Sequence, residues 1–554
     1  MSVLSDPGLS AARARLRPPV MSVAEGSERV GAQAFKGLVL ALVALGLGLR
    51  LAALLGGRSL WLDELYLAPN VLERGFLDLA APLVNQQIAP LGFLFLAKLG
   101  TLAPVEPELG LRIWSFLASA AALLLFAPMM RRLGASRLAT LIALASVALL
   151  ERMIWHGVEF KQYGTEFAAG VVMTLLCLRL LERPSAGRRA AFAAAGAAVT
   201  LLAFAAPFIL APGGLVALAR DLRERDRRGA AATALTGALW LASFAVASLA
   251  ILSGDTQGDM QDRFWWPHFF PLELSPYAVE WLITHADDLF RKSIGFDVAS
   301  WLALALCLYG VALLAAARRG AALALCLGPT ALAFLGTVAQ AYPFQGRLLH
   351  FTAAGLAPLT AIGAAALVEA FRRPLLAALC ATALLAGPGA RLSVREALDV
   401  SPAFEREGVD QVMETVLDRR EPDEVVYVHA KVAAAVKRFA EREGVALEPV
   451  FWGRDPEASA AHYLEDVQQL ARLDRVWVVS GRYWFWRRTN RYLAFELLEL
   501  YGTPLERVEA ANAEAVLFDF SQEDAPLLLT RDPGPYEPDH SGDAPPDGLY
   551  GLRR

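Results

Sequence analysis

Residues 37–56 read GLVLALVALGLGLRLAALLG, an almost unbroken apolar run. About 20 consecutive apolar residues are enough for one helix to cross a bilayer. Comparable runs recur at 111–130, 138–155, 165–182, 190–204, 207–219, 230–252, 297–316, 321–340, 348–370 and 374–389. The third run and the hairpin at 190–219 are only marginally long enough to span. The sequence therefore predicts a mainly α fold, a polytopic membrane bundle of about eleven transmembrane helices.

The composition agrees with a membrane protein. The 554-residue chain is 56% hydrophobic and only 19% charged, whereas soluble domains are about 25% charged. A net charge of −4 gives no indication of nucleic-acid binding. The four cysteines lie inside apolar runs and are expected to be buried rather than paired or metal-bound; they are Cys177, Cys307, Cys326 and Cys380.

Arginine-rich short loops predict the orientation, because such loops stay in the cytoplasm. The arginines fall in five loops: Arg131, Arg132 and Arg137; Arg183, Arg188 and Arg189; Arg220, Arg223, Arg225, Arg227 and Arg228; Arg318 and Arg319; and Arg372 and Arg373. With eleven spans, all five loops share the side of the N-terminus. The first apolar run has no obvious cleavage site, so it is expected to be retained. We therefore expect a multi-pass membrane protein with its N-terminus in the cytoplasm.

This orientation divides the chain into four parts. Residues 1–35 form a cytoplasmic tail, and 36–389 form the membrane domain with periplasmic loops 57–110 and 253–296. Residues 390–520 are predicted to form a periplasmic α/β domain. Its expected strands are Glu424–His429, Arg475–Ser480 and Ala515–Phe520, and its expected helices are Ala430–Glu443 and Tyr483–Leu500. The alternation favours a mostly parallel sheet. Residues 521–554 are rich in Pro, Gly and Asp and are predicted to be disordered.

Polar side chains in the first outer loop are candidates for chemistry. Asp63 and Glu64 are adjacent and flanked by apolar residues. They are either an ordinary solvated pair or a general base in a cleft of low dielectric constant. Gln87 lies in an amide-rich stretch before Pro90, where it either binds a sugar or caps the following helix.

A second cluster precedes the fourth apolar run. His156, Glu159, Lys161 and Tyr163 lie within eight residues. Ionisable residues at membrane depth are costly and are usually functional. The alternative is that Lys161 extends its ammonium group to the lipid headgroups.

A third cluster lies before the tenth run. Tyr342 and Pro343 are followed by Arg347, on the side opposite the arginine-rich loops. An arginine there is either a phosphate ligand, for which its planar fork is suited, or a headgroup anchor. The aromatic stretch Arg263–Phe270 is more typical of an interfacial belt than of a sugar-stacking platform.

The ordered set of motifs resembles the GT-C superfamily of membrane glycosyltransferases. It is most similar to the bacterial branch of protein O-mannosyltransferases and the aminoarabinose transferase of lipid A. The resemblance covers about 36–390. It rests on the acidic motif at Asp63, a Pro-containing juxtamembrane helix, Leu111-Arg112-Ile113-Trp114-Ser115, Lys161-Gln162-Tyr163, and Tyr342-Pro343 to Arg347. Relatives often carry Arg at the position of Lys161, and the segment from His156 to Glu159 matches no familiar pattern.

The resemblance implies a polyprenyl-phosphate-sugar donor and an acceptor that is an envelope glycan, a lipid or a protein, in contact with membrane lipids. It implies an inverting transfer with Asp63 as the general base and Glu64 as its neighbour. The implied donor and substrate contacts are Lys161, Arg347, Tyr342, Gln87, Tyr163, His156 and Glu159. No cofactor is implied as a requirement. A divalent metal at the acidic pair stays open, although no further ligand set demands one.

A transporter or flippase of lipid-linked sugars is the main alternative. It would use the same cations and the same apolar groove. Transporters usually show internal repeats and helices broken at mid-membrane. The sequence shows no such repeat, and its polar clusters lie at one face. A third hypothesis is that the chain is a non-catalytic scaffold that presents the outer domain.

Overall fold

The computed structural model describes residues 31–56, 58–84, 87–252, 265–273, 275–371, 408–454, 460–481, 498–510 and 513–521. The chain divides into two compact units. The first comprises Met1–Gly57 and Val71–Ala403, and the second comprises Arg58–Asn70 and Phe404–Arg554. The expected tails 1–35 and 521–554 fall almost entirely outside the described residues.

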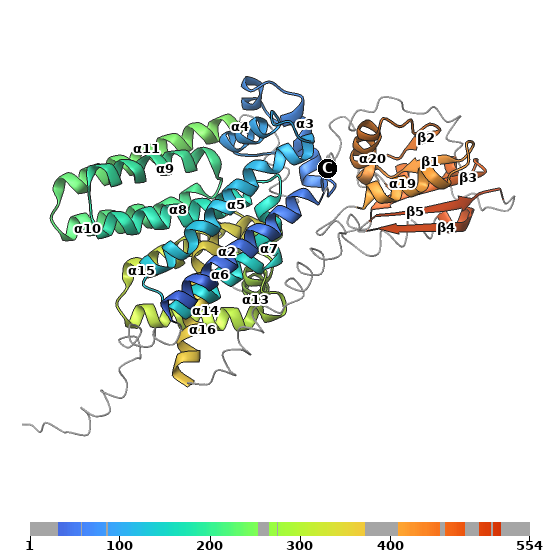
Figure 1. The fold of residues 1–554 in the computed structure, drawn as a ribbon. Coiled ribbons are helices and arrows are strands. Elements are labelled where there is room, and N and C mark those ends of the chain that lie inside the picture. The colour runs from blue at the N-terminus through green and yellow to red at the C-terminus, as the bar shows by residue number, and fades with distance from the viewer. Residues whose placement is uncertain are drawn as a thin grey trace, which may run out of the picture. The chain divides into compact units, whose positions relative to one another are not determined.

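The first unit is a bundle of helices (Figure 1). Its long helices are α2 (Ala32–Leu55), α5 (Pro107–Arg132), α8 (Tyr163–Glu182), α11 (Arg227–Leu252), α15 (Gly320–Val338) and α16 (Ala353–Phe371). Between them lie α4 (Leu91–Gly100), α6 (Arg137–Leu149), α7 (Glu151–Val158), α9 (Ala186–Leu202), α10 (Ala206–Arg223), α13 (Pro276–Arg291) and α14 (Ser300–Ala316). Short 3-10 turns are η3 (Leu77–Ala80), η5 (Trp266–His268), η6 (Asp297–Ala299) and η7 (Gly346–Thr352).

Six helices in the described part of the chain are long and apolar enough to cross a membrane. The bent pair α6 and α7 raises this number to seven. Helices also occupy the expected runs at 190–204, 207–219 and 297–316, but α9, α10 and α14 do not meet the same criteria of length and hydropathy. The run 374–389 lies outside the described residues. The membrane bundle is therefore observed, whereas the count of eleven spans is not confirmed.

Small residues let the helices of the bundle approach closely. A Cβ atom on Gly310 of α14 would lie 2.1 Å from the carbonyl oxygen of Leu359 on α16. A Cβ on Gly363 of α16 would lie 2.0 Å from the carbonyl oxygen of Leu306. Tight backbone contact of this kind replaces the hydrophobic effect as a driving force between helices in lipid.

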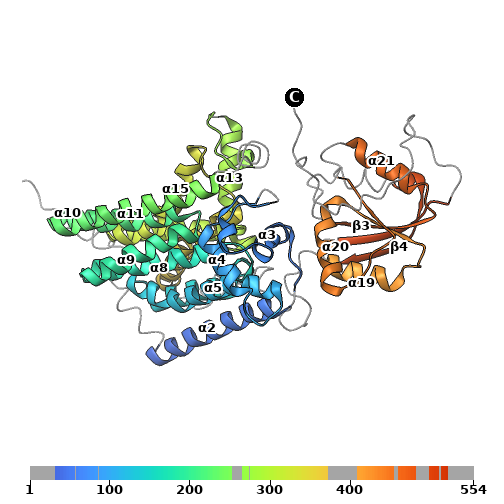
Figure 2. The ribbon, with the colours of Figure 1, turned by 90° about the horizontal axis from the view of Figure 1, so that it is seen from above.

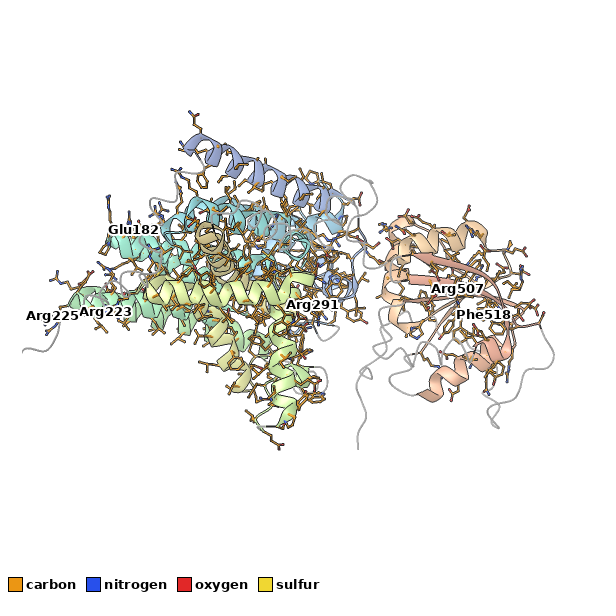
Figure 3. The ribbon with its side chains drawn as sticks, turned by 90° about the horizontal axis from the view of Figure 1, so that it is seen from below. Glu182, Arg223, Arg225, Arg291, Arg507 and Phe518 are labelled. Atoms are coloured by element: carbon orange, nitrogen blue, oxygen red, sulfur yellow. The ribbon has the colours of Figure 1, made fainter. Side chains whose placement is uncertain are left out.

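An ion-pair network joins α9, α10 and α11. Arg189 donates both terminal nitrogens to Asp221, at 2.7 and 2.8 Å, and one of them also to Thr233 at 3.0 Å. The hydrogen bond from Arg189 is the main reason that the pKa of Asp221 is lowered. Arg223 and Arg225 lie together at the end of the α10–α11 hairpin (Figure 3). An arginine of the predicted arginine-rich loops thus also stabilises the packing of these three helices.

The second unit contains a five-stranded sheet of order β2-β1-β3-β5-β4. The strands are β1 (Val425–Val428), β2 (Val450–Trp452), β3 (Arg475–Gly481), β4 (Thr503–Ala510) and β5 (Ala513–Asp519). Its helices are α3 (Leu62–Leu72), which continues into the first unit, α19 (Val409–Arg419), α20 (Ala430–Glu443) and α21 (Ala460–Leu470). α19 and α20 cover one face of the sheet and α21 covers the other (Figure 2).

The sheet is only partly as expected. β1 pairs in parallel with β2 and β3, but β5 pairs antiparallel with β3 and β4. The prediction of a mostly parallel sheet therefore holds for one half, because β4 and β5 form a hairpin at the edge. Most of the helix predicted at Tyr483–Leu500 lies outside the described residues.

Candidate functional site

A broken helix carries the residues before α8. α6 and α7 meet at Leu150 with a bend of 55°. The break would expose carbonyl groups inside the bundle, and these need partners in an apolar setting. The fully buried guanidinium of Arg50, from α2, supplies them. It donates to Ser119 Oγ at 2.7 Å and to the carbonyl oxygens of Gly46, Ala148, Val147 and Met153 at 3.0, 3.3, 2.8 and 3.1 Å.

α7 presents a buried histidine–carboxylate pair. His156 Nδ1 lies 2.7 Å from Glu159 Oε2, and both side chains are at most 3% exposed. The His156 ring packs edge-on against His350, with ring centroids 4.9 Å apart, and against Tyr163 at 5.4 Å. His350 Nδ1 lies 2.7 Å from the carbonyl oxygen of Ser293, so that nitrogen carries a proton. Because the Glu159 carboxylate contacts Nδ1 of the His156 ring, Nε2 of the same ring points away from Glu159.

Lys161 lies at the start of α8. Its Nζ donates to Gln87 Oε1 at 2.8 Å, and its backbone carbonyl accepts from Ser115 Oγ at 3.3 Å. The residue is only 5% exposed. A lysine ammonium just before a helix N-terminus adds to the positive end of the helix dipole. This corner of the bundle therefore favours an anion.

Tyr342 and Arg347 share the turn between α15 and α16. The Tyr342 hydroxyl donates to the carbonyl oxygen of Leu348 at 2.9 Å. Burial, and after it the charges of Glu166 and Tyr163, raise the pKa of Tyr342 well above its usual value. Arg347 lies in η7 and is half-buried. Tyr342 therefore lies near Tyr163, but its proton is used within its own turn.

Glu166 is a buried carboxylate that the sequence did not single out. Its Oε1 accepts from the backbone nitrogens of Phe204 and Ala205, at 2.9 and 3.2 Å, where α10 begins. In sequence it is one acidic residue in an apolar run, and only the fold brings the start of α10 to it. Its bonds to two backbone groups indicate a structural role.

A histidine pair joins η5 to α13. His268 Nδ1 lies 3.5 Å from His285 Nε2, and His285 stacks on Trp281 with ring centroids 3.8 Å apart. Burial lowers the pKa of His268 to about 4, and the neighbouring charges of His285, Lys292 and Arg347 add to this effect. Burial also lowers the pKa of His285. The charge of Asp288 opposes this effect, so charges of both signs lie near the histidine pair. The sequence did not single out this pair.

The acidic motif belongs to the second unit. Glu64 is fully buried, 3.4 Å from Arg58 Nη2, and its Oε2 accepts from the backbone nitrogen of Trp61. Asp63 is half-buried in the first turn of α3. Ser59 Oγ donates to Asp410 Oδ2 of α19 at 2.7 Å, so the segment is tied to the α/β domain.

The structure therefore groups the predicted residues into separate sets. His156, Glu159 and Tyr163 are in contact, and Lys161 binds Gln87. Asp63 and Glu64 lie in the other compact unit. Among the described residues, no group of three His, Cys, Asp or Glu side chains could hold a metal ion.

Comparisons with known proteins give only distant likenesses. No protein-family model matches the sequence, and no curated protein matches it. The apo oligosaccharyltransferase of Archaeoglobus fulgidus is 13% identical, with a TM-score of 0.49, covering 90% of this chain and 76% of that chain. Apo ArnT from Cupriavidus metallidurans is 14% identical, with a TM-score of 0.48, covering 87% of this chain and 98% of that chain. ArnT bound to undecaprenyl phosphate is 13% identical, with the same TM-score and coverage.

Proposed function

We propose that this chain is a membrane glycosyltransferase of the GT-C type. It transfers a sugar from a polyprenyl-phosphate donor to an acceptor on the periplasmic side of the bacterial inner membrane, with inversion. The observation that carries the proposal is the contact of the buried Lys161 with the half-buried Gln87, just before the N-terminus of α8. A transporter would use the same cation, so the proposal also rests on the sequence motifs.

The chemistry assigns a role to each set of residues. The acceptor oxygen attacks the anomeric carbon and its proton passes to Asp63, while the bond from that carbon to the phosphate oxygen breaks. The electron pair leaves with the lipid phosphate, so negative charge grows there and nearby cations stabilise it. Lys161 and Arg347 are the proposed cations. Gln87, whose oxygen accepts from Lys161, would donate through its amide nitrogen.

Three further assignments follow from the contacts. Glu64 holds the start of α3 through Arg58 and the Trp61 backbone, so its role is to position Asp63. His156, Glu159 and Tyr163 form the wall next to Lys161 in sequence and are proposed to contact the substrate. Tyr342 donates to Leu348, so it would have to break that bond before it could donate to a phosphate.

The test is a transfer assay in proteoliposomes with radiolabelled polyprenyl-phosphate sugars and crude envelope acceptor. Asp63→Asn should lose about 10²–10⁴ of the rate, as expected for a missing general base. Asp78→Asn, an exposed carboxylate in the same loop, is the matched control. Lys161→Gln should weaken donor binding, whereas Lys36→Gln, an exposed lysine of α2, should not.

The alternative function gives a different pattern. If the wild type moves labelled donor across the bilayer but forms no product with any donor, the chain is a transporter. If Asp63→Asn transfers sugar at the wild-type rate while Lys161→Gln does not, the enzyme stands and the assignment of its base is wrong.

A further inference from the structure

The carboxyl edge of the sheet in the second unit carries polar side chains that the transfer reaction does not use. β2 and β3 lie on opposite sides of β1. Right-handed crossovers then place α20 and α21 on opposite faces, as Figure 2 shows. In open α/β sheets, a crevice forms outside the carboxyl ends of the strands where the connections diverge in this way, and ligands bind there. In this domain that point lies between β1 and β3.

Three neighbouring strands bring polar residues to this edge. His429 directly follows β1, and its backbone nitrogen donates to the carbonyl oxygen of Val479 at 3.0 Å. Ser480 is the last residue but one of β3. Glu514 is the second residue of β5 and lies opposite Ser480 in the antiparallel register. Because β5 runs against β3, its first residues lie at the same edge as the end of β3.

Ser480 and Glu514 point to the same face, because directly opposed residues in a sheet share a face. They lie on the same sheet face as Val478 and Val516, two positions along each strand, which pack in the core with α21 residues such as Val467. Ser480 is 3% exposed and Glu514 is 0% exposed. Two polar groups thus end an otherwise apolar sheet face.

Ser480 is the decisive residue. Its Oγ is buried, and among the residues that the structure describes it has no hydrogen-bond partner. A buried hydroxyl without a partner lowers the stability of the fold, because its lost contact with water is not replaced. Alanine would fill this position for packing alone at no such cost. A hydroxyl at this point of the sheet is therefore best explained by a ligand that pairs with it.

The chemistry of the three side chains limits the ligand. The buried carboxylate of Glu514 lies 3.9 Å from Arg507 Nη1, and it disfavours an anion next to it. An apolar ligand would leave Ser480 without a partner. A carboxylate, a hydroxyl and an imidazole together suit a neutral ligand with several hydroxyl groups.

We propose that the α/β domain binds a saccharide at the carboxyl ends of β1 and β3. Glu514 accepts hydrogen bonds from sugar hydroxyls, Ser480 donates or accepts, and His429 borders the site. The site is separate from the proposed donor contacts, and it does not depend on the transfer reaction.

The experiment uses the full chain in lipid nanodiscs without donor. Binding of glucose, mannose, N-acetylglucosamine and their oligomers is measured by saturation-transfer NMR, with ethanolamine and inorganic phosphate as competing ligand classes. At least one saccharide should bind saturably. Ser480→Ala and Glu514→Gln should each weaken binding by about tenfold, as expected for one lost hydrogen bond. Thr415→Ala, half-buried on α19, and Glu441→Gln, exposed on α20, should bind as the wild type does.

Further measurements separate this site from the donor contacts and from a structural role. Lys161→Gln should retain saccharide binding, even if transfer activity is never found. Ser480→Ala should melt at or above the wild-type temperature, because it removes a buried polar group without a partner. The proposal is overturned if no saccharide binds, if ethanolamine or phosphate binds instead, or if Ser480→Ala binds saccharide normally. Loss of binding in Lys161→Gln, or a sharply lower melting temperature of Ser480→Ala, also overturns it.

Discussion

Replacing Arg50 with methionine should destabilise the membrane bundle more than any other single loss of charge in α2. The guanidinium makes four hydrogen bonds to other helices, to Ser119 Oγ and to the carbonyls of Val147, Ala148 and Met153. Methionine fills a similar volume but donates to none of them. At roughly 1 kcal/mol for each bond, the loss is roughly 4 kcal/mol, in the range of about 3–5 kcal/mol for a broken buried pair.

The buried cysteines offer an assay for this loss. Cys177, Cys307 and Cys326 are at most 3% exposed, so a thiol-reactive fluorogenic maleimide labels them only as the bundle opens. Cys380 lies outside the described residues, so all proteins would carry Cys380→Ala to remove its background.

The expected order of melting temperatures follows from the contacts. Arg50→Met should melt several degrees below the parent, and Arg50→Lys should fall between them, because an ammonium group reaches fewer carbonyls. Arg131→Met, at an exposed position of α5, should melt with the parent. If Arg50→Met melts with Arg131→Met, Arg50 does not hold the α6–α7 break, and our account of that break is wrong.

Three further outcomes are expected. Glu159→Gln removes the carboxylate 2.7 Å from His156. It should lower the transfer rate by about 10-fold or more without changing donor binding. An unchanged rate would exclude the His156–Glu159 pair from catalysis. The pKa of His268 is lowered to about 4, so as pH falls the unfolded chain takes up a proton before the folded chain does. The free energy of unfolding should therefore fall between pH 6.5 and 4, by at most about 3 kcal/mol. In thermal melts, His268→Gln should remove this pH dependence. Ser59→Ala breaks the 2.7 Å bond to Asp410 and should lower the stability of the second unit by about 1–2 kcal/mol, measured by denaturation, and a wild-type midpoint would contradict it.

The apolar runs predicted the helices well because the signal for a membrane helix is local. An apolar run such as 165–182 predicts both that a helix forms and how long it is, and α8 occupies this run. The same reasoning missed α7 and α13, because neither is a long apolar run: α7 spans eight residues, and α13 has charged residues along one side. The short strand β2 was missed because three residues give no period to read. The hairpin partner β4 was missed because it is an exposed strand without an apolar run.

The candidate site was only partly predictable. Lys161 and His156 stood out because charged residues are rare next to apolar runs. The partner of Lys161, by contrast, is Gln87, 74 positions away in sequence. Arg50 was visible inside the first apolar run, but the carbonyls that it binds belong to a break about a hundred residues later. Glu166 looked like an ordinary acidic residue because the backbone groups that it binds lie on another helix.

The bond between Ser59 and Asp410 has a consequence for biosynthesis. The two residues are 351 positions apart. At about 5–20 residues per second, roughly 20–70 s of translation separate them. During that time the segment with the acidic pair lacks its partner from α19. A ribosome that stops early therefore leaves a chain whose first helices are complete but whose acidic segment is not fixed, so the acidic segment matures only when the last domain has been made.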